Sequence, residues 1–104
     1  MEHFNRLTPA EAERLAYLVE EMGEALQAIG KILRHGYDSH NPDAPHAGDN
    51  RVQLTKELVD VAGAIARMAA EGDVPAHVLS GADPNKGDRY MHHQTGKRHV
   101  STSQ

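Results

Sequence analysis

The chain has 104 residues, a formal net charge of −4 and no cysteine, and each of these facts excludes something. The length fits one domain. The negative charge argues against a protein that binds nucleic-acid polymers, because such proteins usually carry a basic face. Without cysteine, the chain can form no disulfide, no thiolate zinc site and no cysteine nucleophile.

Hydrophobic residues make up 38% of the chain and aromatic residues only 4%, which predicts a thin core. Self-association is a reasonable way to complete such a core. No apolar run near the amino terminus resembles a signal peptide. No stretch approaches the roughly 18 to 20 apolar residues that span a membrane. We therefore expect a soluble, cytoplasmic protein with no membrane partner.

The first predicted element is a long helix over residues 9–35. Thr8 is a suitable N-cap, Pro9 suits the first helical position, and Glu11 completes a capping box. Gly36 is a typical residue at a helix end. Between these signals, apolar residues recur at helical spacing: Leu15, Leu18, Met22, Leu26, Ile29 and Leu33.

Residues 36–49 are rich in Gly, Pro, Asp and Asn, which predicts a loop. A second helix follows, with Asn50 as its cap, Gln53 three positions on, and Gly72 after its end. The apolar stripe of this helix consists of Leu54, Leu58, Val61, Ile65, Met68 and Ala69.

Asp73 is a candidate cap for a third, weaker helix that begins near Pro75. Pro84 interrupts this segment, so we expect two short pieces that run to about His92. The domain is therefore predicted to comprise residues 1–92, and residues 93–104 are predicted to form a flexible tail.

These elements predict an all-α fold: a long antiparallel helical hairpin plus a short third helix. One hairpin cannot easily cover both apolar stripes. We therefore expect the chain to complete a four-helix core by oligomerisation, as a homodimer or a homotetramer.

Each long helix carries two carboxylates, one turn apart, beside its apolar stripe. Glu21 lies at the edge of the first stripe and Glu24 about 60° further round the helix. Glu57 and Asp60 repeat this layout on the second helix. Because residues three apart share a helical face, each pair can converge on one ion.

Four carboxylates at a half-buried edge repel one another, and a cation that neutralises them stabilises the cluster. Oxygen ligands suit Mg²⁺ or Mn²⁺ rather than zinc. The alternative is that these residues are ordinary solvated helix carboxylates, since pairs with this spacing also arise by chance.

The segments that carry the four carboxylates are LVEEMGEALQAIGKI at 18–32 and ELVDVAGAI at 57–65. Together they resemble the MazG-like all-α nucleoside triphosphate pyrophosphohydrolases, whose E-x-x-E and E-x-x-D motifs fall on Glu21, Glu24, Glu57 and Asp60. The resemblance implies that these four residues hold the metal and that residues 1–92 form a MazG-like domain. Val59 departs from the family, in which a Gly is common before the Asp.

The resemblance also implies a reaction: a nucleoside triphosphate reacts with water to give the monophosphate and pyrophosphate. A deoxynucleoside triphosphate is the expected substrate. The resemblance further implies an obligate oligomer whose subunits share each site. Glu21 is the first candidate to accept the proton of the attacking water, because its place beside the apolar stripe raises its pKa. Glu24 is the second candidate.

Several polar side chains are candidates for substrate binding. Lys31 and Arg34 are placed to hold phosphate oxygens, or simply to complement the helix dipole. Asn50 and Arg51 stand where a base, a ribose or a phosphate could bind, although Asn50 also suits a cap. The remaining candidates are Tyr37, which could stack on a base or pack against the hairpin, and Lys86 and Arg89 on the third segment.

Two other functions stay open. The chain could be a non-catalytic helical module that senses nucleotides or mediates dimerisation, although all four carboxylates are intact. It could instead be a four-helix carboxylate protein with a redox metal, which the lack of an E-x-x-H motif disfavours. His92, His93 and His99 fit no standard zinc spacing.

Overall fold

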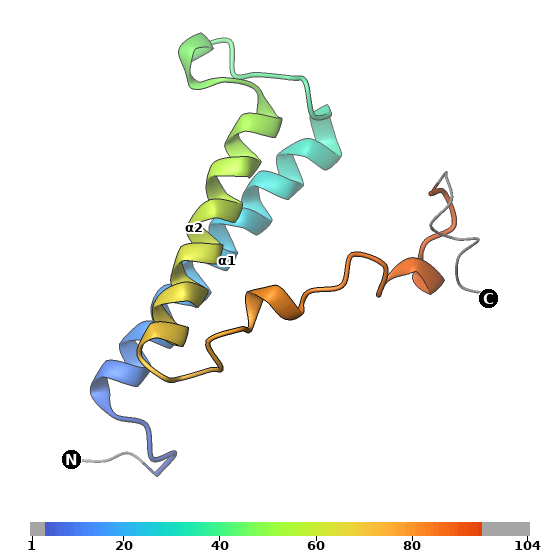
Figure 1. Ribbon diagram of the computed structural model, residues 1–104. Coiled ribbons are helices and arrows are strands. Elements are labelled where there is room, and N and C mark those ends of the chain that lie inside the picture. Colours follow the sequence, from blue (N-terminus) through green and yellow to red (C-terminus); the bar gives the residue numbers. More distant parts are fainter. Residues whose placement is uncertain (1–3, 95–104) are drawn as a thin grey trace.

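The computed structural model describes residues 4–94, and its main feature is a pair of long helices (Figure 1). α1 spans Pro9–His35 and α2 spans Asn50–Ala70. The two helices run antiparallel and pack on each other, joined at one end by residues 36–49. Within the described residues there is no strand, only an isolated bridge between His40 and Asp49. The predicted all-α hairpin is confirmed.

Both ends of α1 are fixed by the groups that the sequence predicts. The Thr8 hydroxyl accepts a hydrogen bond from the Glu11 N–H at 3.1 Å, and the Glu11 carboxylate accepts one from the Thr8 N–H at 2.8 Å. This pair satisfies two N–H groups that a helix start leaves without partners. At the other end, the Gly36 N–H donates to the Ile32 carbonyl, with a φ of +89° that favours glycine.

The start of α2 differs from the prediction by one residue. Asp49, not Asn50, is the N-cap, because its side chain accepts a hydrogen bond from the Val52 N–H at 3.0 Å. Asn50 is the first helical residue, and its side-chain amide donates to the Gly36 carbonyl at 3.0 Å. Asn50 therefore ties the start of α2 to the end of α1.

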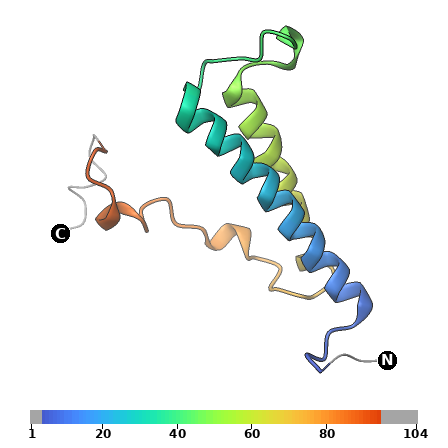
Figure 2. The same cartoon turned by 180° about the vertical axis from the view of Figure 1, so that it is seen from behind.

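The segment after α2 is less regular than predicted. It contains two short pieces, as Pro84 indicates, but both are 3-10 helices: η2 at Leu79–Gly81 and η3 at Asp88–Tyr90. The prolines of this segment lack a backbone N–H and its glycines have a low helix propensity, and no α-helix begins near Pro75. Figures 1 and 2 show the segment leaving the end of α2 and projecting to the side. From residue 95 onward, the predicted tail lies outside the described residues.

Asp73 does not cap a helix; it pairs with α1. The Arg14 Nε lies 2.6 Å from the Asp73 Oδ2, and the Arg14 Nη2 lies 2.9 Å from Oδ1, so the ion pair has two hydrogen bonds. Both side chains are mostly shielded from water. The hydrogen bond from Arg14 lowers the pKa of Asp73. This pair joins the first half of α1 to the turn that follows α2.

The contact between the two helices is built mainly from small residues. Ala25 and Ala28 of α1 are buried against α2, whose own buried residues are Ala64 and Met68. The fifth buried residue is charged, Glu21. Helices approach more closely where the side chains at their contact are small. A single chain therefore has a narrow core, and none of its described large side chains is fully buried.

Most of the apolar stripe predicted for α1 stays exposed in the single chain, together with Val19. These side chains recur at intervals of four and three residues, the spacing of a helix that packs along another helix, and they are 37% to 82% exposed: Leu15, Val19, Met22, Leu26, Ile29 and Leu33. The stripe does not make α1 a membrane-spanning segment, because no helix within residues 4–94 is long and apolar enough to cross a membrane.

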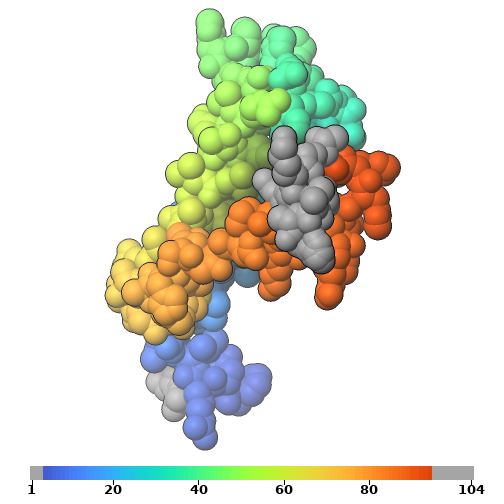
Figure 3. Space-filling model, turned by 45° about the vertical axis from the view of Figure 1, so that its right-hand side comes forward, coloured from blue at the N-terminus to red at the C-terminus, as the bar shows by residue number. Residues whose placement is uncertain are grey.

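The single chain has an open, flat outline, with extents of 50, 48 and 22 Å along its principal axes. Its radius of gyration is 17.9 Å, against the roughly 13 Å expected for a compact chain of this length. Figure 3 shows this outline, with loop 36–49 at one end and the amino-terminal residues at the other. Many of its large apolar side chains are accordingly exposed.

Asp73→Asn is expected to lower the midpoint of thermal unfolding at neutral pH, because Arg14 loses a charged partner. The folded-state pKa of Asp73 lies below its unfolded value. Its stabilisation is therefore fully present above roughly pH 4 and is lost as the pH falls through the folded-state pKa. Circular dichroism melts of variant and wild type should converge in strongly acidic solution.

Glu71→Gln is the control for this measurement. Glu71 pairs with Arg67 at 3.2 Å in an exposed contact between residues four apart, and such contacts contribute little stability. Equal effects of the two substitutions at neutral pH would show that the Arg14–Asp73 pair has no special role.

Candidate metal centre

Three carboxylates from the two helices meet at one point. One oxygen from each of Glu21, Glu57 and Asp60 lies within 4.8 Å of the others. Glu21 belongs to α1 and the other two residues to α2, so helix packing brings them together. These are three of the four carboxylates that the sequence indicates. Nowhere else in residues 4–94 do three potential metal ligands lie within reach of one ion.

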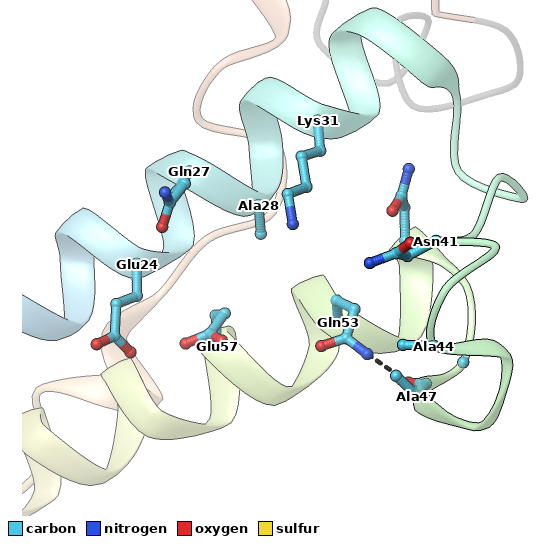
Figure 4. A pocket seen from close by; sticks show the side chains of 11 residues that line it. Glu24, Gln27, Ala28, Lys31, Asn41, Ala44, Ala47, Gln53 and Glu57 are labelled. Carbon is cyan, nitrogen blue, oxygen red and sulfur yellow. Dashed lines mark hydrogen bonds between the residues drawn. The ribbon is translucent and has the colours of Figure 1, made fainter.

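Glu24 lies beside this group and is not one of its three members. Its carboxylate faces that of Glu57 across the space between the helices (Figure 4). Glu24 is exposed, whereas only 7% of the surface of Glu21 is exposed. The two carboxylates of the first motif therefore occupy different environments in the site.

Burial and repulsion raise the pKa of both Glu21 and Glu24. For Glu21, burial is the main cause, followed by the charges of Glu24 and Asp60. For Glu24, which is exposed as a whole residue, partial loss of hydration at the carboxylate comes first and the charge of Glu57 second. The expected rise in the pKa of Glu21 is thus supported. Since the ionised cluster is disfavoured, a nearby cation stabilises it.

One oxygen of Glu57 has no partner. The Glu57 Oε1 is buried and takes part in no hydrogen bond. A buried carboxylate oxygen without a partner is unfavourable, and a cation held jointly with Glu21 and Asp60 would provide one. All three ligands are carboxylate oxygens, the donor type that Mg²⁺ and Mn²⁺ prefer. The residues present therefore fit a divalent cation that prefers oxygen ligands.

Tyr17 also belongs to the acidic surroundings, although it was not predicted from the sequence. The charge of Glu21 is the main cause that raises the pKa of Tyr17, followed by burial and the charge of Asp60. Tyr17 and Asp60 both border a cavity of about 640 Å³ that also touches Arg67. Its position four residues before Glu21, one helical turn away, is the signal by which the sequence could have indicated it.

A second, more polar cavity of about 370 Å³ lies between α1, α2 and loop 36–49. Glu24 and Glu57 line one end of it (Figure 4). Four amide side chains and one cation also line it: Gln27, Asn41, Asn50, Gln53 and Lys31. Its small lining residues are Ala28, Ala44, Ala47 and Gly48.

Gln27, Asn41 and Gln53 are therefore potential ligand-binding residues that were not predicted from the sequence. Gln27 lies between Glu24 and Lys31 on one face of α1, and this spacing was the available signal. Gln53 lies four residues before Glu57 on one face of α2, which was the corresponding signal. Asn41 enters the cavity because of the path of the loop, which has no comparable periodicity.

Among the predicted substrate-binding residues, Lys31 and Asn50 line the polar cavity. Arg51 instead stacks on Tyr37, with its guanidinium carbon 4.3 Å from the ring centroid, and pairs with Asp38 at 3.5 Å. These contacts hold the two ends of the loop segment together. Tyr37 and Arg51 are thus in contact with each other and do not line the cavity.

The other three substrate candidates also lie away from the acidic cluster. The Arg34 side chain lies over Gly30 of its own helix. Lys86 and Arg89 belong to the segment after α2, where Arg89 stacks on the Tyr90 ring at 5.2 Å from its centroid. A single chain brings none of these three cations to the site.

The histidines do not form a metal site within the described part of the chain. His92 and His93 are exposed and contribute to no group of three metal-ligating side chains there. His99 lies outside the described residues.

Comparison with known proteins identifies no relative. No protein-family model, no curated protein and no solved structure matches the chain. The resemblance to the MazG-like family is therefore carried by the two acidic motifs and stays a prediction.

Glu57→Gln is expected to weaken Mn²⁺ binding by at least about tenfold, because it removes one negatively charged ligand from the group of three. Titration calorimetry, or electron paramagnetic resonance of free Mn²⁺, measures this affinity. Glu13→Gln is the matched control, since Glu13 is an exposed glutamate of α1 outside the group. Wild-type affinity in Glu57→Gln would show that the ion binds elsewhere.

Proposed function

We propose that this protein is a metal-dependent nucleotide pyrophosphohydrolase, which converts a (deoxy)nucleoside triphosphate and water to the monophosphate and pyrophosphate. The observation that carries the proposal is the convergence of Glu21, Glu57 and Asp60 beside a polar cavity. The order of the two acidic motifs, which resembles that of the MazG-like enzymes, supports the same reaction.

Glu21, Glu57 and Asp60 would hold the cation, with Mg²⁺ expected and Mn²⁺ as a substitute. A divalent cation bound there neutralises charge on the phosphate oxygens. Glu24 lies outside the group of three, and its raised pKa suits a residue that takes a proton from water. We therefore favour Glu24 as the general base over Glu21, whose oxygen lies within the group.

The chemical step is a hydrolysis in which the bonds balance without a further reactant. The oxygen of water forms a bond to phosphorus, and its proton passes to the Glu24 carboxylate. The P–O bond of the phosphoanhydride breaks, and the leaving oxygen keeps the bonding electron pair. Release of the monophosphate and pyrophosphate returns the site to its starting state once Glu24 loses its proton to solvent.

Self-association is part of the proposed function. The exposed stripe of α1 has the spacing of a helix packed along another helix, and a second chain would cover it. Two hairpins would then form a four-helix core, as a homodimer or as half of a homotetramer. A partner chain could also supply the cations that a single chain lacks at its acidic cluster.

The wild-type protein, incubated with Mg²⁺ and a panel of canonical and modified (deoxy)nucleoside triphosphates, is expected to release monophosphate and pyrophosphate from one or a few of them. Anion-exchange chromatography resolves the products. Glu24→Gln should lower kcat by roughly 10² to 10⁴, because it removes the general base, and EDTA should stop the reaction. Glu13→Gln should retain wild-type turnover.

A folded, metal-loaded wild type that hydrolyses nothing in the panel would contradict the proposal. That result would favour the non-catalytic alternative, a helical module that senses nucleotides or mediates dimerisation. The intact acidic cluster is the observation on which that alternative also depends.

Leu26→Glu is expected to shift the protein from an oligomer towards the 11.4 kDa single chain, because it places a charge in the centre of the apolar stripe. Size-exclusion chromatography with light scattering measures the mass. Lys56→Glu, which changes an exposed residue of α2 outside the stripe, should leave the mass unchanged. A wild type that runs as a single chain at all concentrations would contradict self-association.

A further inference from the structure

Two amides in the polar cavity have one end held by the backbone of the loop. The Gln53 Nε2 donates to the Ala47 carbonyl, which leaves the Gln53 Oε1 as a free acceptor. The Asn41 Oδ1 accepts a hydrogen bond from the Asp43 N–H at 2.9 Å, which leaves the Asn41 Nδ2 as a free donor. The group that each amide offers to a ligand is therefore set before any ligand binds.

The start of α2 borders this cavity but is not available to bind an anion. Helix starts attract phosphates because their first N–H groups are free. Here the first four N–H groups of α2 already donate to residues 37–49: Asn50 to Ser39 at 2.8 Å, Arg51 to Tyr37 at 3.0 Å, and Val52 and Gln53 to Asp49 at 3.0 and 3.1 Å.

The charges that line the cavity also disfavour phosphate. Its two carboxylates, Glu24 and Glu57, lie at the end beside the acidic cluster, where the proposed cation would bind, and the rest of the cavity has a single cation, Lys31. A phosphate chain carries several negative charges and needs more cations than this. Neutral amides that both donate and accept, beside the methyl groups of three alanines, instead suit an uncharged ring with donors and acceptors on its edge.

We infer that the polar cavity binds the nucleobase of the substrate, with Asn41 and Gln53 contacting the edge of the ring. This inference rests on the proposed function, and it specifies the orientation of the bound nucleotide. The phosphates lie at the opposite end, at Glu21, Glu57 and Asp60.

Lys31 lies seven residues beyond Glu24, which places it about 10 Å further along α1, at the base end. In this arrangement its ammonium donates to the base or the ribose, whereas the sequence left open whether Lys31 holds phosphate oxygens or complements the helix dipole. Asn41 and Gln53 are then the residues that determine which base is accepted.

The experiment separates the two ends of the nucleotide. Binding to the full chain is measured by NMR titration for the four deoxynucleosides, which have no phosphate, and for magnesium tripolyphosphate, which has no base. Asn41→Asp keeps the oxygen that accepts from the Asp43 N–H but replaces the free donor with an acceptor. It should change the relative affinities of the deoxynucleosides by about tenfold and leave that of tripolyphosphate unchanged.

Asn85→Asp is the matched control, because it adds the same charge on the segment after α2 and lines no part of the cavity. It should change neither affinity. A second variant, Lys31→Met, should likewise weaken deoxynucleoside binding and spare tripolyphosphate. Circular dichroism confirms that each variant is folded.

Three results would overturn the inference: a wild type that binds no deoxynucleoside, an Asn41→Asp variant with the wild-type order of base affinities, or a Lys31→Met variant that loses tripolyphosphate binding. These readouts do not require turnover. An inactive wild type whose base preference responds to Asn41→Asp would defeat the proposed function alone. An active wild type whose preference does not respond would defeat only this inference.

Discussion

The close approach of α1 and α2 along a seam of alanines governs the rest of the structure. Because Ala25, Ala28 and Ala64 are small, the longer carboxylates beside the seam reach into the same space from both helices. Burial beside the seam, followed by repulsion from Glu24 and Asp60, raises the pKa of Glu21. The same small side chains bury little apolar area, which is the main source of folding free energy. The feature that assembles the acidic cluster thus also leaves the single chain with a narrow core.

The helices could be predicted because their signals are local. α1 begins after Thr8 and ends before Gly36 because of hydrogen bonds to residues three or four positions away. Its ends could therefore be predicted from the neighbouring sequence. Asp49 and Asn50 are both good caps, and the choice between them is made by a distant group: Asn50 is engaged by the Gly36 carbonyl, 14 residues earlier. Likewise, the pairing of Asp73 with α1 could not be read from the residues around it.

In the candidate site, too, the part that depends on helical spacing could be predicted from the sequence, and the part that depends on the loop could not. The wheel positions of Glu21, Glu57 and Asp60 follow from helical geometry, but the helices pack along the alanine seam rather than along the predicted apolar stripe of α1, and this packing brings the three oxygens together. The amide-lined cavity follows from the path of residues 36–49, which is fixed by hydrogen bonds from Asn50 and Arg51 to loop carbonyls. These hydrogen bonds join residues that are 11 and 14 positions apart in the sequence and follow no periodic pattern. The spacing of residues therefore does not predict them.

The polar cavity and the acidic cluster draw all their side chains from residues 21–60, a continuous stretch of the chain. The segment after α2 contributes none of them, and it is joined to the helices by the Arg14–Asp73 pair and by the contact of η2 with α2. The hairpin is therefore modular. Recombination could lengthen, shorten or replace the chain beyond Asp73, or fuse it to another domain, while the acidic cluster and the polar cavity are inherited unchanged.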